Sequence, residues 1–421
     1  MQIARFTAAA ALLLLLAAAA PAGDVLRVGT SGDYPPFSLE IPPEDESDPA
    51  PRFEGFDLAV AYAFAEARGL LVMPTRFRWP HLVRDFGADR FDVAMSGVTV
   101  TPERSALGRF SVPVVETGTV VLVRDALAHP DVAALNERNV RIGVNAGGYL
   151  ERVAAANFRE ATRVAIPDNL AVLNAFVEGS LDAVVTDTIE APGWRKMAPD
   201  ATQLGPLTRD RKAYWIRPDE AALADSLDRW LLAFEASGEL AALRAKHFGP
   251  IDVPRTAEPL PALLAAMDER LAMMPGIAVA KRRAGIPLVV VSRETRVLDA
   301  AVESVRRAAA RRGVEPPPEA RVRVLFRAQI EAAKQVQRDA LADATYERPE
   351  TIPDIDDVLR PALIRMGEQI ARLVVALPPG LSPQRVREAA SDQLRTRWLS
   401  PASRAGIADA VAALVPETAV Q

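Results

Sequence analysis

Three of the cationic residues in the stretch 270–293, Arg270, Lys281 and Arg293, stand where helical sequence would normally bury apolar groups. Arg270 and Lys281 are eleven residues apart, about three helical turns, so a continuous helix would point both toward the same side. Pro275 and Gly276 lie between them and would bend that helix. Arg293 follows on the next predicted helical segment. Three cations that converge on one interior surface need an anion with several carboxylates to neutralise them, so the stretch predicts a polyanion pocket.

A second set of polar residues follows the apolar run FDVAM. Arg104 can grip a carboxylate through its forked guanidinium, and the residues before it offer backbone N–H groups and hydroxyl groups. The alternative is that Arg104 lies on the surface at the start of a helix, which the residues TPER would also fit. We expect the set to bind a carboxylate, through Ser96, Gly97, Thr99, Thr101 and Arg104.

Composition excludes several other kinds of site. The net charge is −5 and the arginines are scattered along helix-like segments, which argues against a nucleic-acid partner. There is no cysteine, so disulfides, thiolate nucleophiles and cysteine metal sites are excluded. The three histidines (His81, His129 and His247) lack ligand-like spacing, so we expect no metal.

The first 22 residues resemble a secretory signal. Arg5 supplies the positive end, residues 8–20 form an Ala/Leu run, and Ala20 to Ala22 form a small-x-small cleavage site. A membrane anchor is the alternative, but it needs about 20 strongly apolar residues, and this run is shorter and rich in alanine. We expect signal cleavage near Ala22, a periplasmic or secreted protein, and no membrane association afterwards.

The elements that position these residues follow two patterns. In 24–248, short strands alternate with helices, which predicts an α/β domain with largely parallel sheets and ligands at the strand ends. A proline-rich interval predicts a linker at 249–259, and helical periodicity beyond it predicts an all-α domain at 260–421. The predicted strands are 26–30, 91–95, 120–123, 140–144 and 183–186, and the predicted helical stretches are 56–68, 148–158, 169–178, 260–312, 319–346, 354–377 and 383–415.

Four ordered segments of the first domain resemble the periplasmic amino-acid-type solute-binding proteins. The resemblance implies two α/β lobes joined by crossing strands, which close over a small anionic ligand. A closer similarity is to the cyclohexadienyl dehydratases, carried by RWPHLVRDF (78–86), VNAGGYLERVAAANF (144–158), PDN (167–169) and TDTIE (186–190). The four ordered segments are SGDYPPFS (31–38), FEGFDLAVAYAFAE (53–66), DRFDVAMSGVTVTPER (89–104) and GSLDAVVTD (179–187).

The dehydratase resemblance implies conversion of prephenate to phenylpyruvate, or of arogenate to phenylalanine. One acid protonates the departing hydroxyl while the ring carboxylate leaves as CO2, and no cofactor is needed. The resemblance implies Glu190 as that acid, because burial in a closed cleft would keep it protonated. The alternative for Glu190 is that it caps the following helix or faces solvent at the start of that helix. Asp187 would hold a ligand amino group or orient its neighbours, and the choice stays open.

Other residues of the first domain are candidate walls of the cleft. Asn145 and Gly147, with Gly148, form a strand-to-helix turn whose amides can receive a carboxylate, or else a plain turn. Asp33 and Trp79 are expected cleft walls, with a core position as the alternative for the tryptophan. One residue departs from the dehydratase pattern: Thr119 stands where a basic residue is expected.

The second domain resembles the exported, gamma-type, all-helical chorismate mutases from about residue 260 to the end. The resemblance is carried by ERL (269–271), AVAK (278–281), IP (286–287), RETRVL (293–298) and FRAQIEAAKQVQ (326–337). It implies that chorismate is held in a compact conformation, with positive charge beside the ether oxygen as that bond breaks.

The mutase resemblance assigns roles residue by residue. Lys281 and Gln337 would donate to the ether oxygen, and Glu294 would accept from the substrate hydroxyl. At Val290 and Ala333 the family often has an acidic residue and a hydroxyl, so two contacts to that hydroxyl are missing. For each cation the alternative is a solvated helix face. The carboxylates would be held by Arg270, Arg293 and Arg365.

Two functions remain in view. In the first, the chain is a bifunctional exported enzyme of phenylalanine biosynthesis: the second domain makes prephenate from chorismate, and the first consumes it. In the second, it is a transport-type amino-acid-binding protein with a helical sensor or docking domain that catalyses nothing. Relatives of the helical domain commonly form dimers, so we expect a homodimer.

Overall fold

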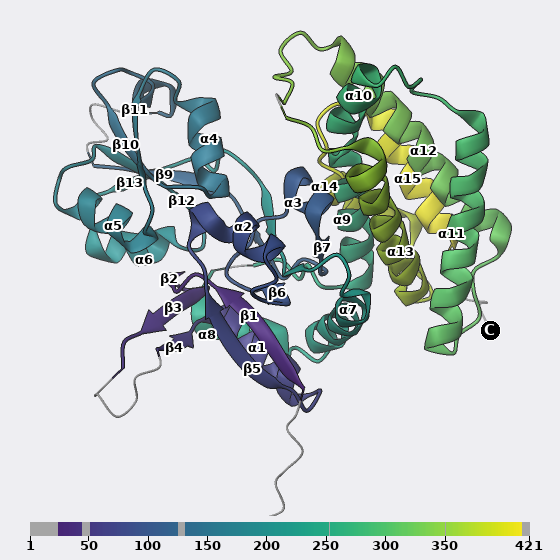
Figure 1. Cartoon of the computed structure of the whole chain (residues 1–421), viewed down its shortest axis with the longest axis horizontal. Helices are drawn as coiled ribbons and strands as arrows, with labels where there is room; N and C mark the ends of the chain where they lie inside the picture. The colour runs from purple at the N-terminus through teal and green to yellow at the C-terminus, as the bar shows by residue number, and fades with distance from the viewer. Residues whose placement is uncertain (1–23, 44–50, 125–130, 252, 350, 415–421) are drawn as a thin grey trace, which may run out of the picture.

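The computed structural model describes residues 24–43, 51–124, 131–251, 253–349 and 351–414. The predicted export signal lies outside these residues. Figure 1 shows an α/β part, coloured purple to teal, beside a bundle of helices coloured green to yellow. Among the described residues, no helix is both long enough and apolar enough to cross a bilayer.

The first lobe is built on a five-stranded sheet in the order β5-β1-β6-β15-β7. Strand β1 pairs in parallel with β5 and β6, whereas β15 runs antiparallel to β6 and β7. A small sheet of β2, β3 and β4 carries Asp33 and Tyr34. The strands are β1 (Val25–Thr30), β2 (Asp33–Tyr34), β3 (Ser38–Ile41), β4 (Arg52–Glu54), β5 (Leu71–Arg76), β6 (Val93–Ala94), β7 (Arg109–Phe110) and β15 (Trp215–Ile216), and the helices are α1 (Phe56–Glu66), η1 (Trp79–His81), α2 (Leu82–Gly87), α3 (Pro102–Leu107), α7 (Ala221–Ala236) and α8 (Glu239–Phe248).

The second lobe repeats this plan with a sheet in the order β11-β10-β12-β9-β13. Strand β10 is parallel to β11 and β12, and β9 is antiparallel to β12 and β13. The strands are β9 (Thr119–Val123), β10 (Arg141–Asn145), β11 (Thr162–Ile166), β12 (Ala183–Asp187) and β13 (Thr202–Leu204), and the helices are η2 (Ala133–Leu135), α4 (Tyr149–Asn157), α5 (Asn169–Val177) and α6 (Ala191–Met197).

Two crossing strands, β8 (Val115–Thr117) and β14 (Asp210–Lys212), join the lobes as an antiparallel pair. This confirms the predicted two-lobed α/β architecture. The prediction of largely parallel sheets is wrong, because antiparallel pairs make up half of the pairings in each five-stranded sheet as described. The reason lies in the crossings: β9 and β15 follow β8 and β14 directly, without an intervening helix, and so enter their sheets in the opposite direction.

The described residues after Gly249 form helices and no strand, in agreement with the prediction of a helical second half. The predicted stretch 260–312 is three helices, with the first break at Met273, beside Pro275 and Gly276. The predicted stretch 383–415 is two helices. The elements are α9 (Pro259–Ala272), α10 (Met274–Arg283), α11 (Val291–Arg312), α12 (Glu319–Ala342), the π-helical turn η3 (Ile355–Leu359), α13 (Arg360–Ala376), α14 (Pro383–Gln393) and α15 (Pro401–Leu414).

The bundle packs against the first lobe, with α9 and α13 against α3 (Figure 1). Buried residues of the two parts, such as Val28 and Leu263, belong to one continuous hydrophobic core. The second lobe has its own separate core clusters, around Val121 and Val120. The first lobe and the bundle therefore form one packed unit, to which the second lobe is attached.

The bundle also holds the outer side of the crossing strands. Arg211 of β14 donates to Asp268 of α9 at 2.9 Å, and also to the backbone carbonyl of Gln393. Arg395 donates to Glu116 of β8 at 2.7 Å. Both crossing strands are therefore bonded to the helical part.

Candidate functional sites

The lobes are closed over a small cavity of about 20 Å³. The backbone N–H of Asn169 in the second lobe donates to Asp33 in the first at 3.1 Å, and the Tyr34 hydroxyl donates to Asp187. A cavity of this size holds about one water molecule, so a larger ligand needs the lobes to open. The lining residues are Tyr34, Trp79, Gly97, Thr99, Arg104, Asn145, Gly148, Tyr149, Leu150, Asn169 and Lys212.

The structure brings five of the predicted dehydratase residues to this cavity: Trp79, Gly97, Thr99, Arg104 and Asn145. The others lie behind its wall.

Three of the predicted residues that do not line the cavity, Ser96, Thr101 and Gly147, have structural roles. Ser96 bonds to Ser31, and the Thr101 hydroxyl accepts from the backbone N–H of Arg104 as the cap of α3. Gly147 has a φ of +73°, and a side chain there would meet Pro80 of the facing lobe. Gly147 therefore allows the close approach of the lobes.

Arg104 is buried rather than on the surface, because α3 places it against the cleft. Its guanidinium donates to the carbonyl of Thr99 at 2.9 Å, and it forms no ion pair with a carboxylate among the described residues. Burial lowers its pKa to about 10. A buried guanidinium without a counter-charge favours an anionic ligand.

Glu190 is buried, with 1% of its surface exposed, which rules out the exposed alternative. It occupies the position before α6 but makes no cap hydrogen bond. Its carboxyl accepts from Asn169 Nδ2 at 2.6 Å and from the Thr186 hydroxyl at 2.5 Å. Burial, and next the charge of Asp187, raise its pKa well above the usual range. Glu190 is thus suited to stay protonated, one hydrogen bond from the cavity through Asn169.

Asp187 orients its neighbours in this structure. Its Oδ1 accepts from the backbone N–H groups of Ile189 and Glu190, at 2.9 and 3.0 Å. Its Oδ2 accepts from the Tyr34 hydroxyl and lies 3.3 Å from the Lys212 ammonium. Asp187 does not line the cavity.

Lys212 is a cleft residue that sequence reasoning missed. It is buried and donates to the Thr99 hydroxyl at 3.0 Å and to the Tyr34 hydroxyl at 3.1 Å. Thr119, where a cation was expected, is buried and donates to Asp210 at 3.4 Å. The available signal was the run DRKAYWI (210–216). Neighbouring strand residues face opposite sides, so either Arg211 or Lys212 had to face the cleft.

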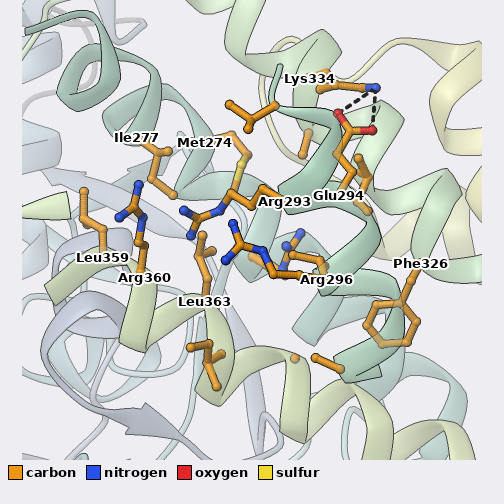
Figure 2. A pocket seen from close by; sticks show the side chains of 18 of the residues that line it. Met274, Ile277, Arg293, Glu294, Arg296, Phe326, Lys334, Leu359, Arg360 and Leu363 are labelled. Atoms are coloured by element: carbon orange, nitrogen blue, oxygen red, sulfur yellow. Dashed lines mark hydrogen bonds and ion pairs between the residues drawn. The ribbon is translucent and has the colours of Figure 1, made fainter. Parts of the chain in front are cut away.

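The helical part holds a larger pocket of about 480 Å³ (Figure 2). It contains the predicted Arg270, Lys281, Arg293, Glu294 and Gln337. Helices α9 and α10 do place Arg270 and Lys281 on the same pocket, despite the break at Met273. Figure 2 shows the guanidinium groups of Arg293, Arg296 and Arg360 gathered at its centre.

The pocket is strongly electropositive. Arg270 is buried, burial lowers its pKa to about 10, and its Nη1 has no hydrogen-bond partner. Burial lowers the pKa of Lys281, and the charges of Arg293 and Arg360 lower it further. Six cations and two carboxylates are among the described residues that line the pocket. Both carboxylates are already paired, Glu294 with Lys334 at 3.2 Å (Figure 2) and Glu368 with Arg109 at 3.4 Å.

Arg365, which was predicted to hold a carboxylate, is not among the residues that line this pocket. Its guanidinium donates to the carbonyl of Ala106 at 2.9 Å, at the contact with the first lobe. Arg360 lies in the pocket instead. The two arginines are five residues apart on α13, about 140° around the helix, so they cannot serve the same face.

Gln337 and Glu294 are placed in the pocket with partners of their own. Gln337 accepts from Lys281 at 3.1 Å through Oε1 and donates to the carbonyl of Ala333 at 3.1 Å through Nε2. Donation to a ligand therefore needs Nε2 to turn away from the helix. The pair of Glu294 with Lys334 likewise holds the carboxylate that was expected to accept a hydroxyl.

Comparisons with known proteins concern the α/β half. Residues 26–250 match the sequence model of the bacterial extracellular solute-binding proteins, family 3. Cyclohexadienyl dehydratase of Pseudomonas aeruginosa is 36% identical over 223 residues, which cover 51% of this chain and 80% of that protein. ABC transporter arginine-binding protein 1 of Escherichia coli is 28% identical over 231 residues, 52% of this chain and 88% of that protein.

A crystal structure of an ancestral amino acid-binding protein, described as a precursor of cyclohexadienyl dehydratase, is similar with a TM-score of 0.49 and 29% identity. The similarity covers 53% of this chain and 95% of that chain. In the part of the chain that the structure describes, no group of three or more His, Asp or Glu side chains is placed to hold a metal ion.

Proposed function

Because this chain belongs to the bacterial extracellular solute-binding proteins of family 3, we propose that its α/β half is an exported dehydratase that acts on prephenate or arogenate. The observation that carries this proposal is Glu190, a buried carboxyl with a raised pKa behind a cleft that contains Arg104 and Lys212. The 36% identity to cyclohexadienyl dehydratase supports it. Export to the periplasm is part of the same proposal.

The chemistry needs one proton donor and an anion-binding cleft. After the substrate has displaced the Asn169 amide from the carboxyl, Glu190 gives its proton to the ring hydroxyl, which leaves as water. The bond from the ring to its carboxylate breaks, CO2 departs, and the released electron pair completes the aromatic ring. Glu190 regains a proton from water after the lobes reopen. Arg104 holds a carboxylate by charge-assisted hydrogen bonds, and closure excludes bulk water, which keeps the acid protonated.

For the helical half we propose chorismate mutase activity, so that one half makes the substrate of the other. The excess of cations in its pocket supports the binding of a dicarboxylate. Lys281 stabilises the negative charge that develops on the ether oxygen, and Gln337 assists after its amide turns. Arg270, Arg293 and Arg360 hold the two carboxylates. Assembly as a homodimer stays a prediction.

A second candidate function is amino-acid transport with a non-catalytic helical domain. The similarity to the arginine-binding protein of Escherichia coli favours it. Amino-acid transport requires neither a protonated buried acid nor a cationic pocket in a second domain. We therefore rank it below the bifunctional enzyme.

The deciding experiment gives the purified full chain chorismate and prephenate separately. We expect loss of the chorismate absorbance, and formation of phenylpyruvate from either compound. If phenylpyruvate forms from prephenate but not from chorismate, the dehydratase proposal stands and the mutase proposal is excluded. No turnover of either compound, together with tight binding of a free amino acid, would establish the transport function instead.

A further inference from the structure

The wall of the cleft is unusual in its charge. Of the described residues that line the cavity, two are cations, Arg104 and Lys212, and none is Asp or Glu. A ligand ammonium group that leaves water needs acceptors, above all a carboxylate. A keto oxygen needs donors instead, and the hydroxyl of Thr99 supplies one along with the cations.

Asp187, a carboxylate in contact with the lining residues Tyr34 and Lys212, has no acceptor site left. An ionised carboxylate has about four lone-pair positions. Its Oδ1 is occupied by the N–H groups of Ile189 and Glu190, and its Oδ2 by Tyr34 and Lys212. Tyr34 and Lys212 line the cavity and Asp187 does not. In the closed lobes, an ammonium group at this place would therefore meet Lys212 rather than Asp187.

Asp57 accepts from the backbone N–H of the lining residue Gly97, and the other carboxylates bonded to residues around the cavity also have partners, with one exception. Glu190 accepts from Asn169 and Thr186, and Asp210 accepts from Tyr149 at 2.7 Å and from Thr208 at 2.6 Å. Asp33 keeps one oxygen, Oδ1, without a partner, although it does not line the cavity. Asp33 is therefore the competing acceptor that a test must remove.

We propose that Lys212, together with Tyr34, occupies the acceptor sites on Oδ2 of Asp187. As a result, the cleft selects a substrate whose side chain ends in an α-keto acid over one whose side chain ends in an α-amino acid. Resting on the proposed dehydratase function, this names prephenate rather than arogenate as the substrate. Lys212 acts as a specificity residue, since its ammonium repels a ligand ammonium and occupies the carboxylate that would attract it.

The first measurement uses the full-length wild type with both substrates. We expect kcat/KM for prephenate to exceed that for arogenate at least tenfold. Calorimetry gives a readout without turnover, in which phenylpyruvate binds and L-phenylalanine binds at least tenfold more weakly. Equal or better use of arogenate, or tighter binding of phenylalanine, overturns the proposal. If neither substrate is turned over, the dehydratase fails, and the calorimetric preference alone still decides between keto acid and amino acid.

Variants then test the cause. Lys212→Met gives a side chain of similar length and removes the ammonium from Asp187. The ratio of kcat/KM for prephenate to kcat/KM for arogenate should therefore fall tenfold or more. Tyr34→Phe removes one of the four donors and should move the ratio the same way by a smaller factor, and it serves if the methionine variant fails to fold. In Asp33→Asn the ratio should stay within about twofold of wild type. An unchanged ratio in the folded variants at Lys212 or Tyr34, or selective loss of arogenate turnover in Asp33→Asn, overturns the proposal.

Discussion

Lys281 donates a hydrogen bond of 3.1 Å to the side-chain oxygen of Gln337, which joins α10 to α12 across the pocket of the helical half. The same ammonium donates to the carbonyl of Leu288 at 3.0 Å. Both partners are neutral. Burial, and next the charges of Arg293 and Arg360, lower the pKa of Lys281. The positive charge at this point is therefore available to a ligand.

Replacing Lys281 should separate the two activities. In Lys281→Ala, chorismate consumption should fall by about a hundredfold or more, because removing one preorganised charged donor typically has this effect. Conversion of added prephenate should match wild type. Arg282→Ala is the matched control, an exposed residue on the same helix. Equal loss of chorismate turnover in both variants would contradict the role of Lys281.

Glu190→Gln should stop the dehydratase and spare the mutase. The amide fits the same space but cannot release a proton, and general acid catalysis contributes about 10²–10⁴-fold. With chorismate as substrate, prephenate should accumulate, which chromatography of the reaction mixture detects. Calorimetric binding of phenylpyruvate verifies that the cleft is intact. Wild-type phenylpyruvate formation in this variant would remove Glu190 as the acid.

Arg360 and Arg365 should behave differently although they share one helix. Loss of a charged hydrogen bond is worth about 1.5–3 kcal/mol, so Arg360→Ala should lower kcat/KM for chorismate by roughly 10–100-fold. Arg365→Ala removes only a contact to Ala106 and should leave KM for chorismate near wild type. Steady-state kinetics of both variants make the comparison. A larger rise in KM for Arg365→Ala would restore the original sequence assignment.

Glu269 should make stability depend on pH. It accepts from Ser105 of the first lobe at 2.6 Å, and burial raises its pKa from 4.5 to about 7. Its contribution is therefore full below pH 4.5 and lost as the pH rises toward 7, because the folded chain keeps a proton that the unfolded chain has released. Thermal melts of Glu269→Gln between pH 4.5 and 8 should show a smaller decline in Tm than wild type. An identical slope in both proteins would contradict this role.

Periodicity predicted the helical second half and five of the strands, because burial patterns are local, but it missed others such as β5 and β11. The prediction of strand direction failed, because contacts between distant parts of the chain determine it. The direction of β9 and β15 depends on how the chain crosses between lobes, which no pattern within either strand records. The family resemblance named Arg270, Lys281 and Gln337, and these three residues do line one pocket. It named Arg365, whereas Arg360 is the arginine of α13 that lines the pocket, since the helical phase of 354–377 relative to α9 and α10 is fixed by packing.

Lys212 shows a second limit of sequence reasoning. A lysine next to an arginine normally indicates a solvated surface, and only the fold reveals that β14 crosses between the lobes, with Arg211 turned to the bundle and Lys212 to the cleft. Similarly, Thr119 was a correct sign that a cation is missing from one strand, but only the fold shows that Lys212 of another strand provides it.

The contacts of Arg211 and Arg395 tie the crossing strands to the helices, and the first lobe shares its core with them. The second lobe reaches the bundle through ion pairs nearer the surface, Arg159 with Glu347 and Arg209 with Asp392. Such pairs are each worth about 1 kcal/mol or less. We therefore expect that opening of the cleft moves the second lobe, while the first lobe and the helices stay together as one unit.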